Sequence, residues 1–246
     1  MNEDFIFGTR VVIEAIRAGQ PIDKVLIRNG LSNELFGELY QTIKDYKVPF
    51  QYVPGEKLDR ITRKNHQGII ALISPVEFYR LEDLLPWIYE RGEEPFLLIL
   101  DQVTDVRNFG AIVRSCECAG VHGVIIPEKG SARIGEDAMK TSAGALNHVP
   151  VCRVPSLSSA ADFLHQSGLR LIASTEKTDC LYTGTDMKGP LAIVLGSEES
   201  GISPEMLRKA DELAKIPVMG KIGSLNVSVA AALMVYEALR QRNSQV

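Results

Sequence analysis

Cysteine is scarce in this sequence, and its spacing is poor for metal binding. The 246 residues include four cysteines, Cys116, Cys118, Cys152 and Cys180, with one C-x-C but no C-x-x-C pair. Structural zinc sites use more regular ligand spacings, and on a helix the side chains of Cys116 and Cys118 would point in different directions. We therefore expect buried free thiols and no metal site.

Long apolar runs are absent as well. No stretch approaches the roughly 20 apolar residues that a helix needs to cross a bilayer. The first ten residues, MNEDFIFGTR, carry acidic side chains where a signal peptide carries basic ones. The sequence therefore predicts a cytoplasmic protein that does not cross a membrane.

The fingerprints of several common enzyme classes are also missing. The sequence has no G-x-G-x-x-G after its first strand, no G-x-x-x-x-G-K-[ST] and no G-x-S-x-G. These gaps argue against ordinary Rossmann dehydrogenases, P-loop enzymes and hydrolases built on a nucleophile elbow.

Neither sign of charge is in strong excess, because the formal net charge is only −4. The acids are concentrated in residues 77–94, which hold six acidic and two basic residues, whereas residues 1–76 hold nine acidic and ten basic ones. Although the total charge is unusual for a nucleic-acid binder, a local basic face is compatible with the sequence on either side of residues 77–94.

The apolar pattern predicts two α/β domains. Residues 1–76 alternate short helical and strand-like segments and form the first domain, while the acidic residues 77–94 are expected to be a linker with a short helix. A basic cluster, Arg60, Arg63, Lys64 and His66, precedes the last strand of the first domain. A solvated charged turn is the simplest explanation of that cluster.

Residues 95–246 carry continuous apolar runs separated by helical stretches. Such runs are typical of a mostly parallel sheet covered by helices on both faces, with ligands bound beyond the carboxyl ends of the strands. The expected strands are Phe96–Leu100, Gly123–Ile126, Leu169–Ala173, Leu191–Leu195 and Leu213–Val218.

Three polar loops follow these strands and are the candidate site: Asp101–Asn108, Gly196–Gly201 and Gly220–Asn226. Glu198 lies between glycines directly after a buried strand, an unusual place for a carboxylate unless backbone amides or an arginine pair with it. Helix caps at Glu198 and Asn226 are open alternatives. For Arg114, an ordinary surface or interface ion pair is the explanation that would normally be preferred.

Three segments in order closely resemble the motifs of the SPOUT superfamily of methyltransferases, in its SpoU branch of RNA ribose 2′-O-methyltransferases. They are N-x-G-A-I-x-R within residues 101–120, L-x-L-G-S-E-x-x-G within residues 191–201, where Ile193 takes the place of the first leucine, and I-P-V-M-x-x-x-x-S-L-N-V-S in residues 216–228. The match extends over residues 95–246. It departs from the family at Asp105-Val106, where relatives often have Asp-Pro, and at Glu199-Ser200, where a glycine is common.

The resemblance implies a catalytic domain with a C-terminal trefoil knot, S-adenosylmethionine as cofactor and a homodimer. By motif position the catalytic or site-organising residues would be Asn108, Arg114, Glu198, Ser224 and Asn226. The cofactor would be held around Ser142, Leu195, Gly196, Gly201, Ile216, Val218 and Leu225.

The amino-terminal part also has a resemblance of its own. Two motifs carry this resemblance: F-G-x-x-x-V-x-E-A-I in residues 7–16 and H-Q-G in residues 66–68. They are similar to the small α/β RNA-binding domain of the member of the SpoU branch that methylates a guanosine of large-subunit ribosomal RNA. The resemblance therefore implies ribosomal RNA as partner. A transfer RNA methyltransferase of the same family and a non-catalytic RNA-binding protein of ribosome assembly are the alternatives.

Overall fold

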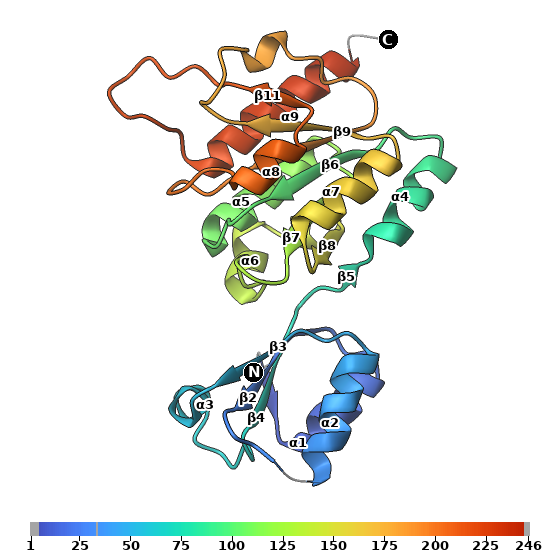
Figure 1. The fold of residues 1–246 in the computed structure, drawn as a ribbon, viewed down its shortest axis with the longest axis vertical. Helices are drawn as coiled ribbons and strands as arrows, with labels where there is room; N and C mark the ends of the chain where they lie inside the picture. Colours follow the sequence, from blue (N-terminus) through green and yellow to red (C-terminus); the bar gives the residue numbers. More distant parts are fainter. Residues whose placement is uncertain (1–4, 33, 244–246) are drawn as a thin grey trace. The chain divides into compact units, whose positions relative to one another are not determined.

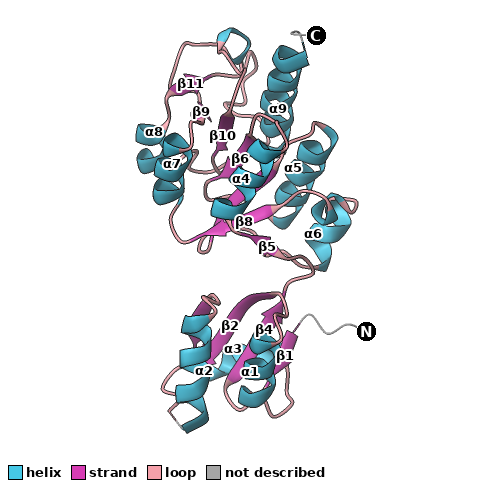
Figure 2. Ribbon diagram, turned by 90° about the vertical axis from the view of Figure 1, so that its right-hand side faces the viewer, coloured by secondary structure: helices cyan, strands magenta, loops and turns pink. Residues whose placement is uncertain are grey.

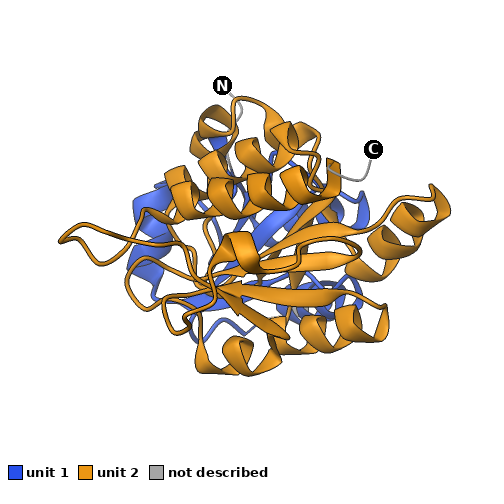
Figure 3. Ribbon diagram, turned by 90° about the horizontal axis from the view of Figure 1, so that it is seen from above, with its two compact units in different colours: residues 1–77, 134–136 blue, residues 78–133, 137–246 orange. Residues whose placement is uncertain are grey.

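The computed structural model describes residues 5–32 and 34–243. The chain forms two compact units, residues up to 77 with 134–136 in the first, and residues 78–133 with those from 137 onward in the second (Figure 3). Both units are α/β, as the sequence predicts.

The first unit is built on a four-stranded sheet with the order β1-β4-β2-β3. β2 and β3 are parallel, and β4 is antiparallel to both β1 and β2. Successive strand residues face opposite sides of a sheet, so Val25 and Ile27 pack against α1 and α2 while Leu26 packs against Leu58 of α3. The elements are β1 (Phe5–Phe7), α1 (Thr9–Arg17), β2 (Ile22–Arg28), α2 (Glu34–Asp45), β3 (Phe50–Val53), α3 (Gly55–Ile61) and β4 (Ile69–Ile73).

The second unit is built on a seven-stranded sheet with the order β11-β9-β10-β6-β7-β8-β5, in which every pair of neighbouring strands is parallel. The predicted parallel sheet is therefore confirmed. Its strands are β5 (Phe78–Tyr79), β6 (Phe96–Leu100), β7 (Gly123–Pro127), β8 (Val151–Val154), β9 (Arg170–Ser174), β10 (Leu191–Leu195) and β11 (Glu212–Ala214).

Helices cover both faces of this sheet (Figures 1 and 2). Helices α4, α7 and α8 share one apolar core with alternate residues of the central strands, and α5 packs against α9. The helices are α4 (Leu81–Glu90), α5 (Val106–Cys118), α6 (Glu136–Thr141), α7 (Leu157–Gln166), α8 (Pro204–Lys209) and α9 (Val227–Asn243), with 3₁₀ turns η1 (Ala145–Asn147) and η2 (Tyr182–Gly184).

The segment expected to link the two domains, residues 77–94, is instead largely built into the second unit. Phe78 and Tyr79 form β5, which pairs with β8 at the sheet edge. Leu81, Leu84, Leu85 and Ile88 of α4 are buried in the core. Their spacing of three and four residues places them on one side of a helix, so the acids between them face water.

Two further expectations need correction. The last predicted strand, Leu213–Val218, is shorter, because pairing ends at Ala214 and the chain continues as a largely exposed loop to Asn226. Cys116 and Cys152 are buried free thiols as expected, whereas Cys118 and Cys180 are exposed. The trefoil knot stays a prediction.

Within the described part of the chain, no helix has both the length and the apolar character needed to span a membrane. Nor does any group of three or more His, Cys, Asp or Glu side chains among those residues have a metal-binding arrangement.

Candidate active site at the carboxyl edge of the parallel sheet

The first site residue, Asn108, is held in the opening turn of α5. Asp105 precedes this helix, and its side chain accepts a hydrogen bond from the backbone N–H of Asn108 at 2.8 Å, an ordinary N-cap. The Asn108 side chain is then free to reach across the sheet edge, where its Nδ2 donates to Glu198 Oε1 at 2.9 Å.

Glu198 is the hub of a polar network. Its Oε1 accepts hydrogen bonds from Asn108 Nδ2, from Asn226 Nδ2 at 2.5 Å and from the backbone N–H of Val227 at 3.2 Å. Val227 is the first residue of α9, so the carboxylate lies at the positive end of a helix, where a negative charge is stabilised. The carboxylate thereby joins its own loop after β10 to the first turn of α5 and to the start of α9.

Asn226 combines the two roles that its sequence position left open. Its Oδ1 accepts a hydrogen bond from the backbone N–H of Ser228 at 3.0 Å, so it caps α9. Its Nδ2 donates to Asn108 Oδ1 at 2.9 Å as well as to Glu198. The cap therefore fixes the amide in the orientation that the network uses.

The loop that carries Glu198 is shaped by close backbone contact. Ser197 and Gly201 exchange backbone hydrogen bonds of 3.1 and 3.0 Å, and Gly201 has a φ of +68°. A Cβ added at Gly196 would lie 2.0 Å from the carbonyl carbon of Gly201. Only glycine fits at position 196, because real Cβ atoms do not approach other atoms that closely.

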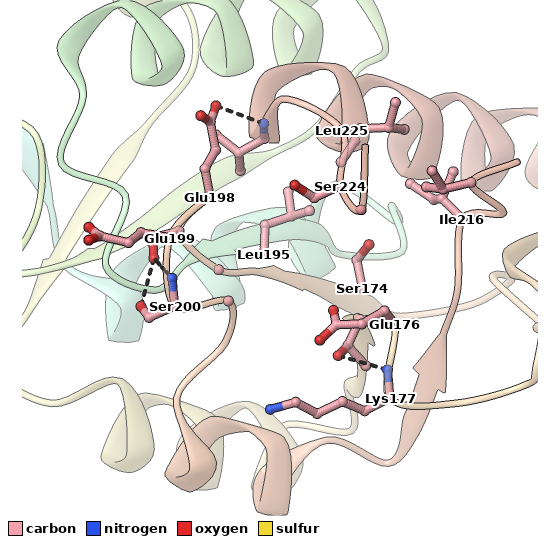
Figure 4. A pocket seen from close by; sticks show the side chains of 18 residues that line it. Ser174, Glu176, Lys177, Leu195, Glu198, Glu199, Ser200, Ile216, Ser224 and Leu225 are labelled. Atoms are coloured by element: carbon pink, nitrogen blue, oxygen red, sulfur yellow. Dashed lines mark hydrogen bonds between the residues drawn. The ribbon is translucent and has the colours of Figure 1, made fainter. Parts of the chain in front are cut away.

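A cavity of about 490 Å³ lies beside this network. Figure 4 shows its lining, with Glu198 on the side of α9 and Glu176 on the side of β9. Of the residues expected at the site, the lining includes Leu195, Gly196, Glu198, Gly201, Ile216, Val218, Ser224 and Leu225.

One wall of this cavity, the turn Ser174–Lys177 after β9, was not predicted from the sequence. This turn follows one of the predicted strands, so the rule that ligands bind beyond the carboxyl ends of parallel strands already pointed to it. The lining carries three carboxylates, Glu176, Glu198 and Glu199, and one amine, Lys177. An excess of negative charge favours a positively charged ligand.

Four predicted site residues lie outside the cavity lining. Asn108 and Asn226 belong to the network beside the cavity, whereas Arg114 and Ser142 belong to neither. Arg114 is exposed on α5, six residues beyond Asn108, and its side chain forms no ion pair or hydrogen bond with any residue that the structure describes. Ser142 is fully buried and donates its hydroxyl to the carbonyl of Met139 at 3.0 Å. A Cβ at Gly110 of α5 would lie 3.0 Å from the Ser142 backbone nitrogen, so Ser142 packs against α5.

Two family models together match nearly the whole chain. Residues 95–236 match the SpoU rRNA Methylase family. Residues 5–79 match a model described as RNA 2′-O ribose methyltransferase substrate binding. The predicted resemblance to the SpoU branch is therefore confirmed over both units.

Similar proteins agree with these matches. A Staphylococcus aureus protein named for the TrmH family of tRNA/rRNA methyltransferases is 40% identical over 244 residues, 99% of this chain and 98% of its own length. The SpoU methyltransferase AviRb from Streptomyces viridochromogenes, solved with the cofactor AdoMet, is 26% identical with a TM-score of 0.61, over 98% of this chain and 90% of that one. A solved RNA 2′-O ribose methyltransferase is 27% identical with a TM-score of 0.57, over 96% and 88%. The chain belongs to the SpoU (TrmH) family of RNA methyltransferases.

Proposed function

We propose that this protein transfers a methyl group from S-adenosylmethionine to the ribose 2′-hydroxyl of a guanosine in large-subunit ribosomal RNA. The observation that carries the proposal is the network of Asn108, Glu198 and Asn226 beside a cavity at the carboxyl edge of the sheet. The substrate-binding family match supports the ribose 2′-oxygen as acceptor. The description of the catalytic family supports ribosomal RNA.

The residues present fit the proposed cofactor. The cavity of about 490 Å³ is within the usual range for small-molecule sites, about 300 to 1,000 Å³. Ile216, Val218 and Leu225 give it apolar surface for a flat ring, and its excess of carboxylates suits a cation. When bound, S-adenosylmethionine would supply a methyl group on a positively charged sulfur.

The polar network positions the surfaces around the reacting atoms. In-line attack needs the ribose oxygen about 3 to 3.5 Å from the methyl carbon, so small displacements of the loops are costly. Glu198 binds Asn108, Asn226 and α9 at once and thereby fixes these loops relative to one another. Ser224 lies in the cavity lining beside them and shapes its floor.

The ribose 2′-hydroxyl must also lose its proton. Motif position points to Arg114 for this step. A guanidinium stays protonated in proteins and is a poor base, so Arg114 orients a phosphate of the bound RNA, which accepts the proton. Arg114 is exposed, and it lies outside both the cavity lining of its own chain and the network that Asn108, Glu198 and Asn226 form. It therefore acts in the site of a second copy, which makes the homodimer necessary for activity.

A complementation experiment tests this arrangement. Arg114→Ala would be inactive alone but retain affinity for S-adenosylmethionine in calorimetric titration, and Glu198→Ala alone would keep on the order of one per cent of wild-type activity. If the site is shared, mixing and re-pairing the two variants creates one intact site per mixed dimer, and on the order of a quarter of wild-type activity returns. No recovery would place both residues in a single chain's site and overturn the shared site.

The substrate is tested by methyl transfer from labelled S-adenosylmethionine. Large-subunit ribosomal RNA fragments, transfer RNA, and the same ribosomal fragment with a 2′-deoxyguanosine at the modified position are compared. We expect transfer to the ribosomal fragment alone. Transfer to transfer RNA would favour the alternative within the family, and cofactor binding without transfer to any RNA would favour a non-catalytic RNA-binding protein.

A further inference from the structure

One end of the four-stranded sheet in the first unit collects most of that unit's exposed positive charge. This end, called here the basic end, comprises the start of α1, the end of β2, helix α3 and the loop 62–68. The end of β1 lies there too, because β1 is antiparallel to β4 and Phe7 pairs with Ile70. The Arg28 side chain at the end of β2 joins the other parts, since it lies 3.5 Å from a Cβ built at Gly55 and 3.3 Å from one built at Gly68.

The two ends of this sheet differ in charge among the described side chains. The opposite end has equal numbers of basic and acidic residues, whereas the basic end has six basic and two acidic ones. At the basic end these are Arg10, Arg28, Lys57, Arg60, Arg63 and Lys64 against Glu56 and Asp59, and at the opposite end Arg17, Lys24, Lys44 and Lys47 against Glu14, Asp23, Glu38 and Asp45.

The basic side chains also differ in their partners. At the opposite end, Arg17 pairs with Glu38 at 2.9 Å, and Lys44 lies over the rings of Tyr40 and Phe50. At the basic end, Arg60 and Arg63 are exposed, and their side chains form no ion pair or hydrogen bond with any residue that the structure describes. Their guanidinium groups are therefore available to an external anion.

The H-Q-G segment fixes the loop that carries these charges. His66 Nδ1 accepts a hydrogen bond from the backbone N–H of Gly68 at 3.0 Å, so its Nε2 carries the proton and donates to Asp59 Oδ1 of α3 at 3.0 Å. Gln67, with a φ of +54°, accepts a hydrogen bond from the backbone N–H of Thr9 through Oε1 at 3.3 Å. The loop is thus tied to α3 and to the start of α1 before any ligand arrives, which lowers the entropy cost of binding.

The start of α1 adds to the positive potential. Helix α1 has no acidic residue in its first turn, and the residue before it, Gly8, offers no side-chain cap. The Thr9 N–H is already bound by Gln67, but the helix dipole at this point still favours an anion. Arg10 is exposed beside it.

We infer that the basic end is the surface through which this domain holds the phosphate backbone of RNA. The inference rests on the proposed function, since it deepens the role of the substrate-binding unit by naming its contact surface. The unpaired guanidinium groups of Arg60 on α3 and Arg63 on the fixed loop suit a ligand with a regular row of phosphates, because each phosphate neutralised releases condensed counterions. Arg60 and Arg63 are the central contacts, and His66 is a positioning residue.

The test compares two double variants of the full-length protein that remove the same charge. Arg60→Ala with Arg63→Ala alters the basic end, and Lys44→Ala with Lys47→Ala alters the opposite end. Binding of a fluorescein-labelled polyuridine oligonucleotide is followed by anisotropy over a range of salt concentrations, so the readout does not depend on which nucleotide is methylated.

We expect the basic-end variant to bind RNA about tenfold more weakly, with a salt slope shallower by about 0.7 for each phosphate that the variant no longer neutralises, and the opposite-end variant to bind like the wild type. S-adenosylmethionine affinity should be unchanged in both. Equal RNA affinities of the two variants would overturn the inference while leaving the methyl-transfer proposal intact. If the basic-end variant binds RNA more weakly but the wild-type protein methylates no RNA, the inference about the RNA-binding surface stands and only the proposed reaction is overturned.

Discussion

The side-chain amides of Asn108 and Asn226 are joined by a hydrogen bond of 2.9 Å across 118 positions of sequence. One lies in the first turn of α5 and the other immediately before α9, and both also donate to Glu198. Because each amide is oriented by its own helix, the site forms only when both helices are packed in place. The network therefore links the packing of the fold to the geometry of the cavity.

Replacing Glu198 by alanine should reduce activity much more than stability. The variant leaves two amides and the Val227 N–H without their shared acceptor, but the site is accessible to water, so we expect a loss of about 1 kcal/mol or less in the free energy of unfolding. We expect kcat for methyl transfer to fall by on the order of a hundredfold, because the loops lose their common anchor. Steady-state kinetics and urea unfolding check the two expectations.

The matched control for this variant is Glu205→Ala, since Glu205 is exposed in the first turn of α8 and lies outside the cavity lining. It should keep wild-type kinetics. An equal fall in kcat in both variants, or a normal kcat in Glu198→Ala, would remove the network from the mechanism.

Gly196→Ala should destabilise the second unit. The added Cβ would lie 2.0 Å from the backbone of Gly201, so the loop must move. We expect a loss of about 3 kcal/mol in the free energy of unfolding, at the upper end of the usual cost of overpacking. The control is Gly220→Ala, where no atom lies within 4 Å of the added Cβ. Urea unfolding measures the difference in free energy of unfolding between the two variants, provided that their curves have similar slopes. Equal midpoints would show that the loop adapts freely to the added Cβ.

Stability should fall as the pH is lowered through the range just below 6.5. Burial lowers the pKa of His122 below its ordinary value of 6.5, against a smaller opposing effect of its hydrogen bond to Glu93. The neutral ring accepts a hydrogen bond from the Phe96 N–H through Nδ1. The unfolded chain then binds more protons than the folded one in this range, so the free energy of unfolding decreases as the pH falls.

The measurement is urea unfolding between about pH 7.5 and 5.5 for the wild type and His122→Gln, above the range in which carboxylates titrate. The wild type should lose more stability over this interval than the variant does. Parallel curves for the two proteins would show that His122 does not contribute to the pH dependence.

Two of the four thiols should react quickly in the folded protein. Cys118 and Cys180 are exposed, whereas Cys116 and Cys152 are buried. Burial raises the pKa of Cys152 to about 12 and also raises that of Cys116, so neither forms the reactive thiolate. Titration with 5,5′-dithiobis(2-nitrobenzoate) should give two fast thiols, and all four after denaturation. Cys118→Ser and Cys180→Ser should each remove one fast thiol, and a third fast thiol would mean that the core opens easily.

The central strands could be predicted because burial on both faces makes them continuously apolar. LAIVL at residues 191–195 is fully buried, and its predicted limits match those of β10. β8 was missed because Arg153 interrupts its short apolar run, and β5 because two residues carry no periodic signal. The apolar residues of α4 have a helical spacing that could be recognised in the sequence, but the acidic residues between them suggested a linker.

The candidate site was predictable in its residue types rather than in its contacts. Motif positions identified Asn108, Glu198 and Asn226, but the hydrogen bonds among them depend on where distant loops fold. Helix geometry alone separates Arg114 from Asn108, since six residues at about 100° each place them some 120° apart around α5 and about 9 Å along it. The turn Ser174–Lys177 was not singled out, and none of the three motifs that carry the resemblance covers it.

The order of strands in the second sheet has a consequence for synthesis on the ribosome. The central pair, β6 and β10, joins Phe96 to Leu191, whereas the intervening chain supplies outer strands of the sheet. Contacts between segments so distant in sequence form slowly. The nascent domain must therefore emerge as far as β10 before its central pair of strands can form. Until then one edge of β6 stays unpaired, and this interval is when chaperones would be most useful.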